Sequence, residues 1–83
     1  MDITLKLYAT LTPFLPEGAK KNQVPLELPT GTSVMDVLNR YQIPKEKCHL
    51  ILINGNHTPL DQADLKLLTQ GDTLAIWPPV AGG

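Results

Sequence analysis

Hydrophobic and polar residues alternate in the first third of the chain, and a period of two is typical of half-buried β-strands. The apolar side chains of residues 2–8 all fall on one side: Ile3, Leu5 and Leu7. Residues 24–28 repeat the alternation around Pro25. Because proline has no N–H to donate, this second segment is expected at a sheet edge, paired with the first as an antiparallel hairpin. Residues 11–22, with two prolines and a glycine, are expected to be a long irregular connection.

Two longer strands are predicted in the second half of the chain, and the segment between them, residues 57–68, is expected to form a weak short strand and then a turn of helix. Residues 50–53 are a continuous apolar run that ends at Asn54-Gly55, a strong hairpin-turn signal. Since its polarity does not alternate, both faces of this strand are expected to meet apolar neighbours. In residues 73–77, Ala75 and Trp77 lie on the side opposite to the larger aliphatic residues. We therefore expect Trp77 on the outer face of the sheet, in an exposed patch that serves for binding.

One main helix is expected over residues 34–41. Its apolar residues recur at helical spacing and so share one face: Val34, Val37, Leu38 and Tyr41. Ser33 and Asp36 resemble a capping box at its start, and Pro44 stops the pattern.

These elements predict a single α+β domain, in which one main helix packs across one face of a mixed sheet of four to five strands. The first and last strands are the expected central pair, because their apolar faces match and neither has an interior proline or glycine. The predicted domain covers residues 1–77, and residues 78–83 are expected to form a flexible tail.

Composition excludes several classes of function. The 83 residues carry a net charge of −1 without a basic stripe, which argues against a nucleic-acid partner. Neither a signal peptide nor a run of membrane-spanning length is present, so a cytoplasmic domain without a membrane partner is expected. One cysteine and two histidines make neither a disulfide nor a zinc site, so we expect no metal and no cofactor bound by this chain.

Side chains suited to catalysis are sparse. Cys48 is expected to be a small buried hydrophobe, and His49 and His57 are expected at the surface or at strand edges. Asp61 and Asp64 are expected to cap or solvate a short turn rather than to act as an acid–base pair. The sequence therefore predicts a protein with no catalytic side chain of its own.

The chain closes with Trp77-Pro78-Pro79-Val80-Ala81-Gly82-Gly83. The two prolines favour an extended path, and the two glycines lack a Cβ, so this segment is suited to a narrow channel. Six extended residues span at most about 20 Å, enough for the Gly83 carboxylate to reach a buried reaction centre. The reactive group would then be the terminal carboxyl itself.

Three segments together resemble the MoaD/ThiS family of sulfur carriers: Ile53-Asn54-Gly55, Gly71-Asp72 and the aromatic-Pro-Pro-Val-Ala-Gly-Gly ending. The resemblance covers essentially the whole chain and implies the ubiquitin-like β-grasp fold. The ending is more similar to the molybdopterin branch than to the thiamine branch. The connection over residues 11–22 departs from the family pattern, so no partner contact is carried over to it.

The resemblance implies a carrier whose chemistry is done by partners. A ubiquitin-activating-like enzyme would adenylate the Gly83 carboxylate with ATP, and sulfur from a cysteine desulfurase or rhodanese would replace AMP to leave a thiocarboxylate. The tail would then enter the large subunit of molybdopterin synthase, so that a chain monomeric by itself joins a hetero-oligomer. The residues expected to contact partners are Ala75, Trp77, Pro78, Pro79, Val80, Ala81 and Gly82.

Three alternatives stay open at this point. The chain could carry sulfur to a thiazole synthase for thiamine, or it could be a ubiquitin-like modifier joined to protein lysines by isopeptide bonds. It could also be a plain interaction module whose tail has no chemical role. Intact mass and the identity of the partner distinguish these possibilities.

Overall fold

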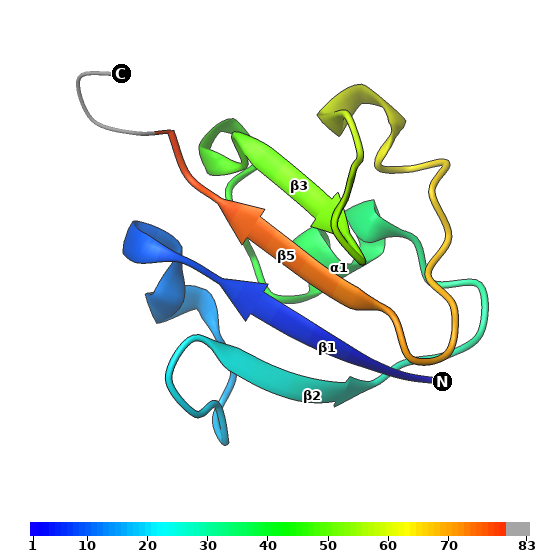
Figure 1. Ribbon diagram of the computed structural model, residues 1–83, viewed down its shortest axis with the longest axis horizontal. Helices are drawn as coiled ribbons and strands as arrows, with labels where there is room; N and C mark the ends of the chain where they lie inside the picture. The colour runs from blue at the N-terminus through cyan, green and yellow to red at the C-terminus, as the bar shows by residue number, and fades with distance from the viewer. Residues whose placement is uncertain (80–83) are drawn as a thin grey trace.

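The computed structural model describes residues 1–79, which form one five-stranded mixed sheet with the order β2-β1-β5-β3-β4. The central strands β1 (Asp2–Leu7) and β5 (Thr73–Trp77) run parallel, and β2 (Gln23–Glu27) pairs antiparallel with β1 at one edge (Figure 1). On the other side, β3 (Leu50–Ile53) pairs antiparallel with β5, and the short β4 (Asn56–His57) pairs antiparallel with β3. The predicted central pair and the edge position of the proline-containing strand are confirmed.

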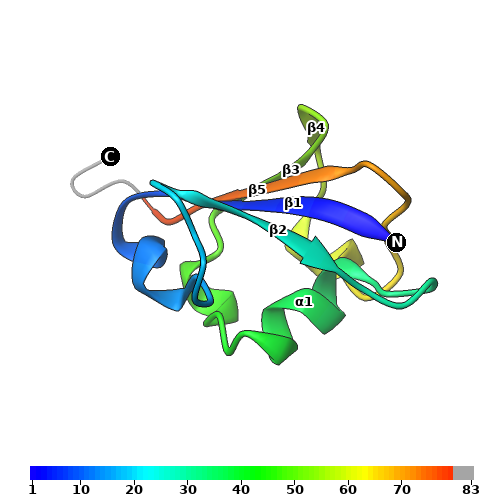
Figure 2. The same cartoon turned by 90° about the horizontal axis from the view of Figure 1, so that it is seen from below.

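The helix α1 (Val34–Arg40) covers one face of the sheet, as Figure 2 shows. Its start is fixed by the predicted capping box. The Asp36 N–H donates to Ser33 Oγ at 3.0 Å, and the Ser33 N–H donates to Asp36 Oδ2 at 2.9 Å. The helix ends one residue earlier than expected, and Tyr41 is only half-buried against the core rather than part of it.

The hydrophobic core lies between α1 and the inner face of the sheet. Its largest fully buried side chains come mainly from the positions that the alternation and the helical spacing had assigned to the inside: Leu5, Leu7, Leu11, Val34, Val37, Leu38, Ile51, Leu74 and Ile76. Burying each of these side chains contributes about 1.5–3 kcal/mol to the stability of the fold. Cys48 is a free thiol and adds no disulfide cross-link. The expected α+β architecture with one main helix is confirmed.

The first part of the segment after β1 differs from the expected irregular connection, whereas residues 15–22 contain no helix or strand, as expected. Ala9–Phe14 form the 3₁₀ helix η1, in which Leu11 is fully buried and Phe14 packs against the core. Ala9 begins η1 with a φ of 51°, a left-handed conformation that is uncommon for residues with a Cβ. The fixed φ of Pro13 is compatible with a short helix, so this proline lies within η1. The second proline that indicated a loop, Pro16, follows the end of η1.

Two shorter 3₁₀ helices, η2 (Lys45–Lys47) and η3 (Leu60–Gln62), connect the remaining elements. The predicted boundary between a domain of residues 1–77 and a tail of residues 78–83 remains a prediction. Within the described part of the chain, no helix has the length and apolar character needed to cross a membrane.

Candidate functional site

The outer face of the sheet carries an aromatic pair at the end of β5. The rings of Tyr8 and Trp77 are stacked, with centroids 4.1 Å apart and planes at 6°. Both side chains are half-buried, and neither belongs to the core cluster. The parallel register that places Leu7 opposite Ile76 brings the next residue of each strand together. The predicted position of Trp77 outside the core is confirmed.

Backbone hydrogen bonds hold the last residues of β5 from both sides. The Tyr8 N–H donates to the Ile76 carbonyl at 3.2 Å, and the His49 N–H donates to the Trp77 carbonyl at 2.9 Å. The next residue, Pro78, is buried, whereas Pro79 is exposed. The sheet therefore fixes the path of the chain up to Pro78, and of the two described tail residues only Pro79 offers much surface to a partner.

The apolar strand beside β5 extends the aromatic pair into a patch. Leu50 lies opposite Trp77, and Leu52 lies opposite Ala75. Both leucines are half-buried beside these apolar residues, whereas Ile51 and Ile53 face the core, so both faces of β3 meet apolar neighbours but only the inner face is covered by the core. We define the outer-face patch as Tyr8, Leu50, Leu52 and Trp77.

Ala75 adds little to the outer-face patch, because its residue surface is only 7% exposed. It was expected among the partner-binding residues, and its small side chain lies low between Lys6 and Leu52 on the neighbouring strands. Four further expected site residues lie outside the described residues: Val80, Ala81, Gly82 and Gly83.

The environment of Cys48 makes its thiol unreactive. Its side chain is buried, its thiol donates to the Pro44 carbonyl with a sulfur–oxygen distance of 3.3 Å, and burial together with the nearby Glu46 charge raises the pKa of the thiol to about 11. A thiol in this environment is a poor nucleophile at neutral pH. The prediction of a small buried hydrophobe is confirmed.

The other polar candidates form no metal-binding cluster among residues 1–79. No group of three or more histidine, cysteine or carboxylate residues there is arranged to bind a metal ion. The expected surface positions are confirmed for His49, His57, Asp61 and Asp64, all of which are exposed.

At the opposite end of the sheet, side chains join two turns. The Asn54 amide donates to Asp72 Oδ1 at 2.8 Å, and the Thr69 N–H donates to Asp72 Oδ2 at 2.8 Å. Asn54 Oδ1 in turn accepts from the Thr73 N–H at 2.9 Å. Asn54 and Gly55 have φ values of 52° and 85°, the positive values that a type I′ hairpin turn requires. The Asn-Gly and Gly-Asp motifs thus form one structural unit, remote from the tail.

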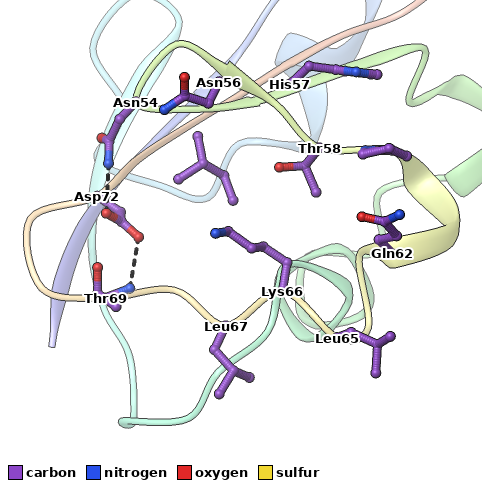
Figure 3. A pocket seen from close by; sticks show the side chains of 12 residues that line it. Asn54, Asn56, His57, Thr58, Gln62, Leu65, Lys66, Leu67, Thr69 and Asp72 are labelled. Atoms are coloured by element: carbon purple, nitrogen blue, oxygen red, sulfur yellow. Dashed lines mark hydrogen bonds between the residues drawn. The ribbon is translucent and has the colours of Figure 1, made fainter.

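A hollow of about 610 Å³ lies next to this unit, between the β3–β4 turn and residues 62–69. Figure 3 shows the Lys66 ammonium and the Thr58 hydroxyl pointing into it, whereas Leu65 and Leu67 point away from it. Those two leucines are 78% and 54% exposed. Polar and apolar residues both line the hollow, which lies near the start of β5, whereas Trp77 of the outer-face patch is the last residue of that strand.

A family model for the Mut7-C ubiquitin family matches residues 1–82. The chain belongs to this family. No curated protein matches it at a significant level. The match covers almost the whole chain, so the ubiquitin-like domain includes every strand and helix described above.

Solved structures similar to this member of the Mut7-C ubiquitin family show the same fold. SAMP1 from Haloferax volcanii is 23% identical with a TM-score of 0.68, over 100% of both chains. A putative molybdopterin converting factor subunit 1 from Pyrococcus furiosus is 21% identical with a TM-score of 0.65, over 95% of this chain and 98% of the other. A chain from the complex of subunits 1 and 2 of molybdopterin-converting factor from Helicobacter pylori is 17% identical with a TM-score of 0.60, over 100% of both.

These likenesses confirm the ubiquitin-like β-grasp fold and agree with the resemblance carried by the sequence motifs. The contacts of Tyr8 and residues 9–14 with β5 were not expected from the sequence. The signal for Tyr8 was present, because the alternation places it on the outer face of β1, but only the parallel register with β5 brings it to Trp77.

Proposed function

We propose that this chain is a ubiquitin-like sulfur carrier, in which the carboxyl group of Gly83 is the reactive group. One observation carries the proposal. The central strand β5 is hydrogen-bonded on both sides up to Trp77, beside an apolar patch, and the sequence that follows is two prolines and then small residues ending in Gly-Gly. This arrangement suits a domain that docks through the outer-face patch while its tail enters a partner.

The chemistry follows from the carboxylate. At neutral pH the Gly83 carboxylate repels nucleophiles and is a poor acylating group. A ubiquitin-activating-like partner would join it to AMP from ATP, releasing pyrophosphate. Sulfur supplied at the oxidation level of hydrosulfide then attacks the acyl carbon, the bond to AMP breaks, and a thiocarboxylate remains. The chain itself provides no catalytic side chain and no cofactor.

The delivery step proposed is to the large subunit of a molybdopterin synthase, which would use the sulfur to build the dithiolene. The aromatic-Pro-Pro ending supports this branch, as does the fold shared with the two molybdopterin converting factor chains. A thiazole synthase as recipient, or isopeptide conjugates on lysines, are the alternative outcomes of the tests below.

Cys48 makes a sharp test possible. Because its thiol is buried and its pKa is raised to about 11, an alkylating reagent applied to the native protein near neutral pH should spare it. A thiocarboxylate on Gly83, ionised and nucleophilic at neutral pH, would react with the reagent. We expect chain purified with its activating enzyme, ATP and a sulfur donor to gain one alkyl group, at Gly83 by peptide mapping. Cys48→Ala is the matched control and should be labelled equally.

Changing the last residue tests the same proposal. Gly83→Ala adds a Cβ where the tail must enter a partner, and deletion of Gly83 moves the carboxyl by one residue. Both variants should lose all thiocarboxylate-dependent activity and keep the thermal unfolding midpoint of the parent chain. A deletion variant that is folded and fully active would overturn the sulfur-carrier proposal.

A further inference from the structure

The charged side chains of this chain are segregated between the two ends of the sheet. At the end where β5 leads into the tail there are five lysines and two glutamates, a formal charge of +3. We call these lysines the tail-end lysines: Lys6, Lys20, Lys21, Lys45 and Lys47. All but the half-buried Lys6 are exposed. The whole chain has a net charge of −1, so composition alone conceals this positive end.

Sheet register places one group of these lysines beside the end of β1. Lys6 lies opposite Gln23, and Gln23 forms an isolated bridge with Lys20. The Leu7 N–H donates to the Asn22 carbonyl at 2.9 Å, which holds the Lys20-Lys21 turn next to the last residue of β1. Since β1 and β5 are parallel, these residues lie at the end of the sheet from which the tail departs.

The second group flanks the tail from the other side. Lys45 and Lys47 belong to η2, which precedes β3 directly. The first residue of β3, Leu50, is opposite Trp77, and the His49 N–H binds the Trp77 carbonyl. The path of the chain out of β5 is therefore bordered by lysines on both sides. The acidic residues at this end, Glu17 and Glu46, do not cancel that charge.

The other end of the sheet is negative. Asp2 lies opposite Glu27, Asp72 joins the turn that precedes β5, and Asp36 caps the start of α1 beside the segment that contains Asp61 and Asp64. Only Arg40, in a hollow shared with Asp2 and Glu27, and Lys66, which faces the hollow of Figure 3, are basic there. Six carboxylates and two cations give this far end a formal charge of −4.

We infer that the tail-end lysines fit an acidic protein surface surrounding the opening that receives the C-terminal tail. This inference rests on the proposed function and names the chemistry of its partner. The electric field of an acidic partner surface would orient a domain with one positive and one negative end. The positive end, from which β5 leads into the tail, would then approach the partner first. Steering of this kind raises association rates by about 10–1,000-fold in well-studied pairs and weakens with salt, because the Debye length at physiological ionic strength is about 8 Å.

A protein surface fits these lysines better than a nucleic acid does. They form two separate groups, each next to a glutamate, on a chain with a net negative charge. Affinity for nucleic acid comes from many phosphate contacts along one continuous basic surface. The chain also leaves β5 with one group on the β1 side and the other on the β3 side, so a partner surface that faces both groups would lie around the point where the chain leaves the sheet.

Two pairs of charge-matched variants test the inference with the adenylating enzyme purified from the host that encodes the chain. Lys45→Gln with Lys47→Gln removes two positive charges at the tail end, and Arg40→Gln with Lys66→Gln removes two at the far end. Both double variants have a net charge of −3. Glu46→Gln at the tail end and Asp64→Asn at the far end each raise the net charge to 0. Thermal unfolding first confirms that every variant is folded.

The measurement is the association rate constant at several salt concentrations, in the absence of ATP so that no nucleotide phosphate is present. At low salt we expect the tail-end double variant to associate about 3–10-fold more slowly than the parent, and the far-end double variant to change by less than about 2-fold. Glu46→Gln should associate faster than Asp64→Asn. All differences should shrink at high salt.

Equal effects of the two double variants would overturn the inference, since net charge and not position would then decide the rate. Faster association of the tail-end double variant would mean a basic partner surface and would overturn it as well. A loss confined to binding of a single-stranded oligonucleotide, with association to the enzyme unchanged, would assign the lysines to nucleic acid instead. ATP–pyrophosphate exchange with the parent chain separates these results from failure of the proposed function, which would abolish exchange altogether.

Discussion

The two ends of the sheet differ in what holds them together. At the far end, the Asp72 carboxylate accepts hydrogen bonds from the Asn54 amide and the Thr69 N–H, so that partly buried side-chain hydrogen bonds join two turns. At the tail end, the last strand is held by backbone hydrogen bonds and by the stack of Tyr8 on Trp77, and exposed lysines surround it. The comparison indicates that far-end residues specify the fold, whereas tail-end residues remain available for a partner.

Removing the Asp72 carboxylate should produce the largest change in stability. Asp72→Ala leaves the Asn54 amide and the Thr69 N–H without their acceptor, and a hydrogen bond to a charged group contributes about 1.5–3 kcal/mol. We expect the free energy of unfolding, measured by urea denaturation, to fall by about 2–4 kcal/mol. Asp2→Ala, which removes only an exposed contact to Gln70, is the control and should change it by less than about 0.5 kcal/mol.

The division between the ends also predicts that Asp72→Ala leaves partner binding unchanged at a temperature where the variant is folded. A loss of affinity under those conditions would show that the far end takes part in docking, and the comparison would fail.

At the tail end we expect a substitution to weaken partner binding, whereas at the far end it lowers the stability of the fold. Trp77→Ala removes the largest side chain of the outer-face patch, and buried aromatic anchors at interfaces contribute about 2 kcal/mol or more, which corresponds to roughly 30-fold in affinity. We expect the Kd for the adenylating enzyme, measured by calorimetry, to rise by about that factor. Trp77→Phe keeps a ring against Tyr8 and should lose much less. An unchanged Kd for Trp77→Ala would remove the outer-face patch from the docking surface.

The smallest expected effect is on the pH dependence of the free energy of unfolding, to which Asp72 at the far end contributes. Burial by itself would raise the pKa of Asp72, but hydrogen bonds from Thr69 and Asn54 and the positive charge of Lys66 outweigh it and hold this pKa below its usual value of 3.8. In that range the unfolded chain binds more protons than the folded chain, so stability rises with pH. The contribution of Asp72 is therefore present above about pH 4 and is lost as the pH falls through its lowered pKa.

The Asp72→Asn variant has no carboxyl group to titrate at this position. Its free energy of unfolding should therefore depend less steeply on pH in the acid range than that of the parent chain. The measurement is the free energy of unfolding between about pH 2 and pH 6 for the parent and the variant. If both slopes are equal, the acid sensitivity of the protein comes from other carboxylates and not from the far-end network.

Several elements could be predicted because their signals are local. The alternation of residues 2–8 and 24–28, the capping box of Ser33 and Asp36, and the Asn54-Gly55 turn each depend on residues a few positions apart. Pro25 placed β2 at the edge for a covalent reason, the missing N–H. The same proline argument was wrong only for residues 11–14, which belong to η1 and bury Leu11, whereas residues 15–22 contain no helix or strand, as expected.

By itself, the sequence determined the set of strands, the single helix, the inward-facing residues and the C-terminal segment that ends in Gly-Gly. Only the tertiary structure decided which distant residues meet. The parallel register of β1 and β5 stacks Tyr8 on Trp77, and the antiparallel pairing of β3 with β5 brings Asn54 to Asp72. The sheet as a whole separates a nearly neutral composition into a positive tail end and a negative far end. Periodicity fixes the face on which a side chain lies, but long-range strand pairing fixes its neighbours.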